Sequence, residues 1–283
     1  MCVSPEAFRG QDRLVGVCSR SAWSVSVPPV DELTGPVLDH LERKNPGGVV
    51  GVYLFGSAAL GGVRPDSDLD LLMVTERSLT RPERAELVSL LLSLSGWKGH
   101  AATYPEVAHR RPIELTSIVV DGERPFSVGA VRDFQYGEWL RDTLVGGGLP
   151  APEEDPDTVV LIATAFTAHR VLCGLPLEGV VAPVPRRRLR DALLANIPEI
   201  LAGIEGDERN TLLALARTLV TLETGAITPK NVAADTVAQT LTGIDRELME
   251  RARDAYLGLA ADRWDDVGAE VTALAHRLAA RAR

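Results

Sequence analysis

The segment 54–72 constrains what this chain can fold into more than any other part of it. It reads LFGSAALGGVRPDSDLDLL: an apolar strand, a Gly-Ser turn, a short connection and a second strand that carries Asp68 and Asp70. Because side chains on a strand alternate between two faces, we expect both carboxylates on one face and the intervening leucines in the core. Two like charges side by side repel each other, so the pattern indicates a cation site rather than a purely structural strand.

The residues before the two acids suit a metal-bound phosphate. Mg²⁺ takes one or two carboxylates together with substrate phosphates. Gly56 permits close approach of the backbone, and Ser57 offers a hydroxyl and an N–H group to a phosphate oxygen. Gly-Ser turns and Asp-x-Asp pairs are each common in structural contexts. Their order on two consecutive strands, however, indicates a metal-phosphate site.

This arrangement resembles the signature of the DNA polymerase β-like nucleotidyltransferases, in which a third carboxylate on a later strand completes the site. The candidate for that carboxylate is Glu114. It lies in the segment 111–120, RPIELTSIVV, which is rich in β-branched residues and is expected to be a strand. A charge in an apolar strand is costly unless it is paired, metal-bound or catalytic. The alternative is an edge-strand glutamate that faces water.

Composition and charge narrow the range of partners. The 283 residues carry a formal net charge of −9, which argues against nucleic acid as a partner and suits a cationic small molecule. No apolar run reaches the ~18 residues of a membrane span, and residues 1–28 lack the pattern of a signal peptide. Cys2, Cys18 and Cys173 are isolated, so they predict neither a zinc site nor a disulfide and fit a cytoplasmic protein.

The hydrophobic pattern predicts an α+β fold, in which a mixed sheet with helices is followed by an all-helical domain. We expect a poorly ordered extension at 1–28, a nucleotidyltransferase domain at 29–150 and a helical domain for substrate and nucleotide at 157–283, after a Gly- and Pro-rich linker at 146–156. The helices expected in the first domain cover 30–42, 81–95 and 126–144. Those expected in the second cover 157–173, 186–203, 207–224, 230–242, 245–260 and 263–282.

Three further motifs resemble a narrower family. They are FQYGEW at 134–139, GDERN at 206–210 and TGAITPKNVAAD at 224–235. Together they resemble the aminoglycoside (3″)(9)-adenylyltransferases, which use ATP to adenylylate streptomycin and spectinomycin. The resemblance implies Mg²⁺ as two ions, ATP as co-substrate and an antibiotic hydroxyl as acceptor, in a monomeric enzyme that confers resistance.

The resemblance also implies roles for individual residues. Asp68 and Asp70 would bind Mg²⁺, and Glu114 would be the general base that accepts a proton from the drug hydroxyl. The remaining implied roles are nucleotide binding by Gly56, Ser57, Arg217 and Lys230, and substrate binding by Trp139, Asp207, Asn210 and Glu205.

Several of these residues also have a purely structural explanation. Trp139 is alternatively a core aromatic on an amphipathic helix, and Lys230 is alternatively a solvated residue at a helix start. Arg217 could instead pair with Glu223 or another acid at the surface. Asp207 could cap the helix that follows it or lie in its first turn, a role that can coexist with ligand contact.

One departure from the family pattern bears on the choice of drug. Gly203 stands where an acid is expected to meet the guanidinium groups of streptomycin, and Glu205 is the nearby acid that could substitute for it. We therefore expect spectinomycin to be the more secure substrate and leave streptomycin open. Two other functions also stay open: transfer by the same fold to another small molecule or to a protein hydroxyl, and a non-catalytic nucleotide-binding regulator.

Overall fold

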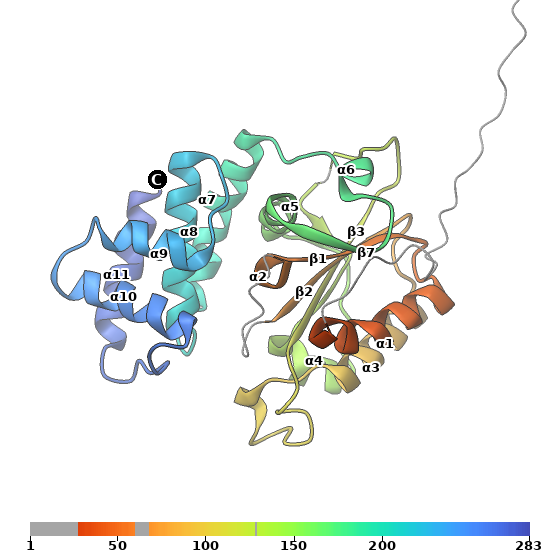
Figure 1. The fold of residues 1–283 in the computed structure, drawn as a ribbon, viewed down its shortest axis with the longest axis horizontal. Helices are drawn as coiled ribbons and strands as arrows, with labels where there is room; N and C mark the ends of the chain where they lie inside the picture. The colour runs from red at the N-terminus through yellow and green to blue at the C-terminus, as the bar shows by residue number, and fades with distance from the viewer. Residues whose placement is uncertain (1–27, 60–67, 128) are drawn as a thin grey trace, which may run out of the picture.

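The computed structural model describes residues 28–59, 68–127 and 129–283 of the chain. They form a sheet-containing unit and a helical bundle that lie side by side (Figure 1). The predicted α+β class is confirmed. The expected N-terminal extension and most of the connection between the Gly-Ser turn and Asp68 lie outside the described residues.

The sheet-containing unit holds the N-terminal elements. Its strands are β1 Val49–Phe55, β2 Leu69–Thr75, β3 Ile113–Val119, β4 Val131–Arg132, β5 Phe134–Tyr136, β6 Glu153–Glu154 and β7 His169–Gly174. Its helices are α1 Pro28–Lys44, α2 Gly56–Ala59, α3 Arg81–Leu94, α4 Arg141–Val145, α5 Asp157–Thr167 and α6 Leu177–Val180, with short 3₁₀ turns η2 Lys98–His100 and η3 Glu138–Leu140.

The main sheet is mixed and has the strand order β5-β3-β2-β1-β7. β1 is antiparallel to both of its neighbours, whereas β2 and β3 run parallel. All seven residues of β1 are buried, because apolar side chains cover both faces of the sheet. A separate two-stranded sheet pairs β4 with β6.

Two hydrophobic cores sandwich this sheet. On one face, leucines and valines of α1 and α3 pack on Leu69, Leu71 and Met73 of β2, which is the inward orientation that the sequence predicts. On the other face, α5 and α6 pack on Leu72 and Val74. Asp70 belongs to this second face, so the acids lie on a covered side of the sheet near its end.

Three predictions about the middle of the chain are wrong. The expected helix over 126–144 is replaced by β4, β5 and the short α4. The expected linker at 146–156 contains β6, which pairs with β4 and is held by ion pairs of Arg132 to Glu153 and Asp155. The expected helix over 157–173 ends at Thr167, and the residues that follow form β7 at the edge of the sheet.

The C-terminal bundle agrees more closely with the sequence pattern. Its helices are α7 Arg186–Ala202, α8 Glu208–Thr224, α9 Lys230–Ala238, α10 Gly243–Leu257 and α11 Gly268–Arg281. Their apolar faces form one continuous core around α8. A smaller cluster joins Val159 and Val160 of α5 to Leu189 and Leu193 of α7, so the two units share an apolar joint. We propose that the division between the units lies between α6 and α7.

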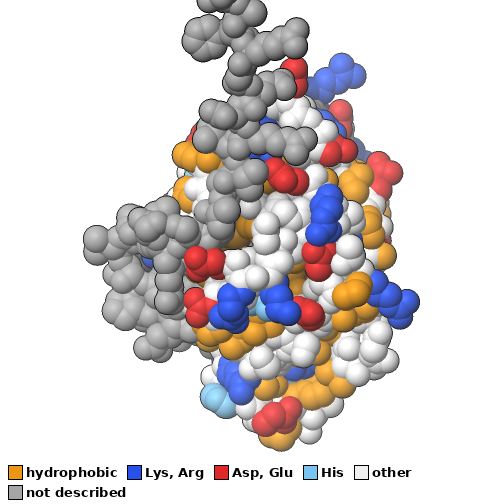
Figure 2. Space-filling view, turned by 90° about the vertical axis from the view of Figure 1, so that its right-hand side faces the viewer, with side chains coloured by type: hydrophobic (Ala, Val, Ile, Leu, Met, Phe, Trp, Pro, Cys, Tyr) orange, Lys and Arg blue, Asp and Glu red, His pale blue; other side chains and the backbone are white. Residues whose placement is uncertain are grey.

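The cysteine and surface predictions have mixed outcomes. Cys173 on β7 is disulfide-bonded, so the expectation of three separate thiols is wrong; spacing along a chain does not report distance in space. Cys2 and Cys18 lie outside the described residues. Within the part of the chain that is described, none of the helices combines the length and apolar character that crossing a bilayer requires. On the face that Figure 2 shows, acidic and basic side chains are interspersed.

Candidate active site

Three carboxylates meet at the starts of β2 and β3. Because these strands are parallel with Asp70 opposite Glu114, both side chains project from the same face of the sheet. Asp68 comes directly before β2, two positions from Asp70, and its side chain is hydrogen-bonded to that of Glu114. The structure thus brings together the two strand acids and the third carboxylate that the sequence singles out.

These carboxyl groups perturb one another strongly. Burial is the largest cause, and it raises the pKa of all three groups, that of Asp70 to about 7. The negative charges of Asp70 and Asp68 raise the pKa of Glu114 further, to well above its ordinary value. Without a cation nearby, three carboxyl groups this close together destabilise the fold, because their ionised forms repel one another. Positive charge beside them reduces this repulsion.

The Gly-Ser turn touches this cluster directly. Phe55 ends β1 and pairs with Asp70, and Gly56 follows with a φ of +67°. A Cβ atom at Gly56 would lie 2.1 Å from Oδ2 of Asp70. Only glycine combines this backbone conformation with such close approach of the carboxylate. Ser57 comes next, in the short helix α2, and is half-buried.

Two cations reach the carboxylates from the bundle. Lys230 is the first residue of α9, and Arg217 lies on α8. The positive charge of Lys230 lowers the pKa of all three carboxyl groups, and that of Arg217 lowers the pKa of Asp70. Burial, followed by the charge of Arg217, lowers the pKa of Lys230 itself. Lys230 is therefore not a solvated helix start, and among the described residues Arg217 forms no ion pair with Glu223.

Asp207 and Asn210 stand at the start of α8, beside Lys230. Nδ2 of Asn210 donates a hydrogen bond to Oδ1 of Asp207 at 2.7 Å. Burial raises the pKa of Asp207, while this hydrogen bond and the charge of Lys230 act against the rise. Asp207 occupies the N-cap position, but its side chain makes no capping hydrogen bond. The expected position at the start of the helix is therefore confirmed, but the side chain bonds to Asn210 instead of capping the helix.

The other two expected drug contacts are placed less closely. Trp139 lies in η3 and is 57% exposed, so its alternative explanation as a core aromatic is wrong. Its ring lies against Gly137. Glu205 is exposed in the turn before α8, and within the described residues no hydrogen bond or ion pair joins it to the carboxylates.

Sequence reasoning missed two charged residues near this site. Nη1 of Arg209 forms an ion pair with Asp262 at 2.8 Å, while its buried Nε has no partner in the described part of the chain. The charge of Arg209 lowers the pKa of both Asp68 and Asp207. Arg209 lies within the GDERN motif, but a one-dimensional pattern does not show which member of a motif faces an acid across the domain joint.

Asp157 is the second missed residue. It begins α5, and its Oδ1 accepts a hydrogen bond from Nδ2 of Asn196 on α7 at 3.1 Å. Burial raises the pKa of Asp157, and the charge of Arg217 is the largest influence against that rise. Asp157 therefore links the sheet-containing unit to the bundle beside a cation of the site.

The donor set fits a divalent cation with oxygen ligands. Among the described residues, no group of three acids, histidines or cysteines already forms a closed metal-binding cluster. Mg²⁺ does not need one, because it keeps water and phosphate oxygens and uses one or two protein carboxylates. Asp68 and Asp70 supply these carboxylates, and the repulsion that they share with Glu114 favours a cation beside them.

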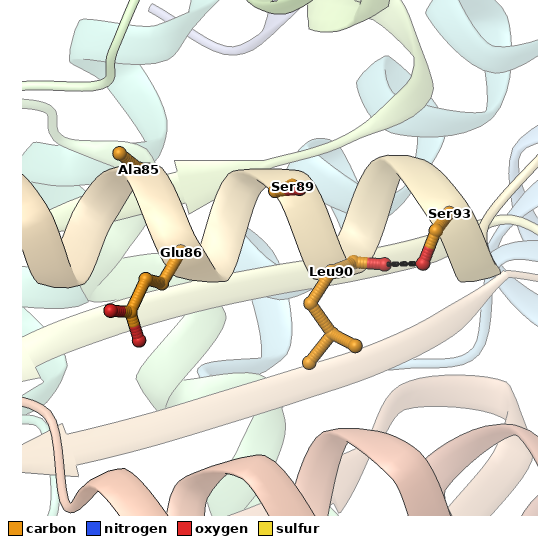
Figure 3. A pocket seen from close by; sticks show the side chains of 5 residues that line it. All are labelled: Ala85, Glu86, Ser89, Leu90 and Ser93. Carbon is orange, nitrogen blue, oxygen red and sulfur yellow. Dashed lines mark hydrogen bonds between the residues drawn. The ribbon is translucent and has the colours of Figure 1, made fainter.

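A hollow elsewhere on the molecule is not this site. It has a volume of about 570 Å³ and runs along an outer side of α3, where Ala85, Glu86, Ser89, Leu90 and Ser93 line it (Figure 3). None of these residues belongs to the carboxylate cluster. The only hydrogen bond drawn among them joins Ser93 Oγ to the carbonyl of Leu90 at 2.6 Å. The cluster of charged side chains, and not the hollow along α3, therefore identifies the candidate active site.

Comparisons with known proteins match both units. A family described as "Nucleotidyltransferase domain" matches residues 37–120, and one described as "Aminoglycoside adenylyltransferase, C-terminal domain" matches residues 179–281. A spectinomycin 9-adenylyltransferase of Staphylococcus aureus is 38% identical over 226 residues, which cover 80% of this chain and 85% of the relative. An aminoglycoside (3″)(9) adenylyltransferase of Escherichia coli is 34% identical, with coverage of 83% and 86%.

A solved structure agrees with these relatives. The crystal structure of a spectinomycin adenylyltransferase of Enterococcus, with ATP and spectinomycin, superimposes with a TM-score of 0.79 at 29% identity and covers 89% of this chain and 98% of its own. The fold and the carboxylate cluster define a nucleotidyltransferase. Within that class, the chain belongs to the aminoglycoside adenylyltransferase family.

Proposed function

We propose that this enzyme transfers the adenylyl group of ATP to a hydroxyl of spectinomycin and thereby confers resistance to the drug. The observation that carries the proposal is the parallel register of β2 and β3, which sets Asp70 beside Glu114, with Lys230 acting on both from the bundle. Relatives named for spectinomycin adenylylation span most of the chain and support the choice of acceptor.

The reaction follows from the residue types at the site. The drug hydroxyl attacks the α-phosphorus of ATP, the bond from that phosphorus to the β-phosphate oxygen breaks, and pyrophosphate leaves. Glu114 accepts the hydroxyl proton, a role for which a positioned carboxylate contributes ~10²–10⁴-fold. Arg217 and Lys230 bind phosphate oxygens, and the Gly56–Ser57 turn holds the triphosphate beside Asp70.

Asp68 and Asp70 are the residues that would hold Mg²⁺. When bound, the ion supplies positive charge that offsets the negative charge on the phosphates and on the carboxylates. Burial, and then the charges of Asp70 and Asp68, raise the pKa of Glu114, so neutralising these two neighbours favours the ionised form that a base requires. The number of ions belongs to this proposal as well: we expect two.

The substrate contacts come from both units. Asp207, oriented by Asn210, is the carboxylate that faces a cationic drug from the bundle, and the exposed indole of Trp139 offers an apolar surface from the sheet-containing unit. Because position 203 has glycine and no acidic side chain, we infer that spectinomycin is a better substrate than streptomycin. A monomer suffices for this mechanism, since one chain supplies every residue named.

Product analysis tests the proposal. The purified chain is incubated with ATP, Mg²⁺ and either spectinomycin or streptomycin, and the products are identified by mass spectrometry and pyrophosphate release. We expect spectinomycin to gain one adenylyl group with one pyrophosphate per product. Pyrophosphate release that is independent of either drug, or none at all, would contradict the proposal. A thermal shift with ATP and Mg²⁺ but no further shift with drug would instead favour the nucleotide-binding regulator.

A further inference from the structure

A basic groove lies between the start of α7 and the end of α8, in the bundle. Figure 1 shows where these two helices lie. Arg186, Arg187 and Arg190 line it, and its volume is about 320 Å³. We propose that this arginine groove binds a phosphate-bearing anion at a site separate from the catalytic carboxylates. None of its lining residues has a role in the adenylyl transfer proposed above.

Charge is the first argument for an anion. Residues 186–190 read RRRLR, in a chain whose formal net charge is −9. Within the described part of the chain, none of these four arginines forms an ion pair. The neighbouring acids Asp191 on α7 and Glu223 on α8 are exposed, and among the described residues neither forms an ion pair with these arginines. Positive charge is thus concentrated here without an internal partner.

The position of the arginines on α7 adds to this effect. α7 has 17 residues, and its first turn contains no acid but three arginines. A helix N-terminus already carries partial positive charge from its free N–H groups, so cations there are unfavourable and anions are favoured. An arginine guanidinium also binds phosphate oxygens in pairs, with charge-assisted hydrogen bonds.

A buried hydroxyl in the groove is the second, independent observation. Thr221 on α8 lines the groove and is only 2% exposed, yet its Oγ1 has no hydrogen-bond partner among the described residues. Buried polar atoms are nearly always paired, and an unpaired one costs free energy. A phosphate oxygen in the groove would accept a hydrogen bond from this hydroxyl.

The shape of the groove limits the size of the ligand. Gly225 is the C-cap residue of α8 and has a φ of +76°. A Cβ atom there would lie 2.5 Å from Nε of Arg186, so glycine leaves room for this arginine side chain. Leu189, Leu193 and Leu222 give the groove apolar lining as well. A volume near the lower end for small-molecule sites suits an oligophosphate or a nucleoside monophosphate. The shared chemistry is the phosphate group.

Calorimetry with inorganic tripolyphosphate in EDTA tests this site. The full-length chain carrying Arg217→Ala and Lys230→Ala serves as background, because these changes weaken phosphate binding at the catalytic site. We expect this background to bind one tripolyphosphate and the further double change Arg186→Ser/Arg187→Ser to weaken binding about tenfold or more. A parallel titration with AMP distinguishes a nucleotide from a free oligophosphate as the preferred ligand.

The matched control is Arg263→Ser/Arg283→Ser, which removes the same charge from exposed positions outside the groove. It should bind tripolyphosphate like the background. A second variant, Thr221→Val, should weaken binding without lowering the Tm, because its hydroxyl has no partner in the free protein. No binding by the background, equal affinities of the groove and control variants, or an unchanged affinity in Thr221→Val would overturn the proposal.

Discussion

Gly56 and Asp70 lie so close together that the geometry of the candidate site depends on single residues. We predict that Gly56→Ala lowers kcat/KM about 10²-fold or more, because the new Cβ would occupy the position of Asp70 Oδ2 and the positive φ disfavours alanine. Steady-state kinetics with ATP and drug measure this loss. Gly35→Ala is the control, since a Cβ at Gly35 meets nothing within 4 Å, and its kcat/KM should not change. Normal activity in Gly56→Ala would contradict the described approach of Asp70.

The paired acids predict a metal-dependent effect on nucleotide binding. Asp68→Asn and Asp70→Asn should each reduce the gain in ATP affinity that Mg²⁺ provides, because each replaces a negatively charged carboxylate of the expected ion site with a neutral amide. Calorimetry measures the ATP Kd with and without Mg²⁺, and the ratio of the two values is the gain. We expect each variant to lower this ratio about tenfold. If both variants keep the full Mg²⁺-dependent gain, the two strand acids do not hold the ion.

The grouping of the three carboxylates could be predicted from residues alone. Asp68, Asp70 and Glu114 stand out because charge in an apolar strand breaks the local pattern, and a broken pattern is informative. Arg209 and Asp157 could not be found in this way. Their positions are ordinary for helix residues, and only the packing of α8 and α5 across the joint brings their charges to the site.

At the scale of elements, a set of hydrogen bonds around Glu83 fixes the start of α3. Glu83 accepts hydrogen bonds from the backbone and hydroxyl of Thr80, in a capping box, and from the guanidinium of Arg77 and the N–H of Gly47. The hydrogen bond to Arg77 is the largest cause that holds the pKa of Glu83 well below its ordinary range. One side chain thus joins the start of α3 to the turn before β1.

We predict that Glu83→Gln lowers the free energy of unfolding by about 1 kcal/mol at pH 7. Because the folded pKa of Glu83 is depressed, its contribution is complete above the ordinary glutamate range and is lost as the pH falls below that range. The difference between wild type and variant should therefore shrink between pH 6 and about pH 3 in urea unfolding. Glu86→Gln, in an exposed pair with Lys44, should change stability little. A difference that is independent of pH would contradict this account.

Strands near the middle of the chain were the least predictable elements. Phe134 and Tyr136 are two residues apart, which is the period of a strand, and both are buried in the three-residue strand β5. This strand is too short to be recognised by its pattern alone, and it is held by its pairing with β3. β7 was missed for a similar reason: it is a short apolar run after a helix, and its pairing with β1 is a long-range contact. The bundle helices were predictable because each repeats its apolar face over several turns.

At the scale of the whole molecule, we expect residues of both units to determine which drug is accepted. Gly203 is the C-cap residue of α7, and a Cβ there would meet only the carbonyl of Glu199, at 3.7 Å, so an acid can be introduced. We predict that Gly203→Asp raises kcat/KM for streptomycin about tenfold and leaves spectinomycin unchanged, because a charge-assisted hydrogen bond becomes available. Kinetics with both drugs measure the ratio.

Glu205→Ala and Trp139→Ala complete this comparison. If Glu205 already serves as the missing acid, its removal should reduce streptomycin activity and spare spectinomycin. Trp139→Ala should reduce activity with streptomycin, because the exposed indole is the expected apolar contact. Strong streptomycin turnover by the wild type that none of the three substitutions alters would mean that the drug pocket lies elsewhere.

The central claim is that Glu114 serves as the base in a centre built with Asp68 and Asp70, and one measurement tests it most directly. ATP affinity by calorimetry and single-turnover transfer to spectinomycin are compared for wild type and Glu114→Gln, which keeps the size of the side chain but cannot accept the proton. We predict an ATP Kd within a few-fold of wild type and a rate of transfer that is lower by ~10² or more. Near-wild-type transfer by Glu114→Gln would contradict the account.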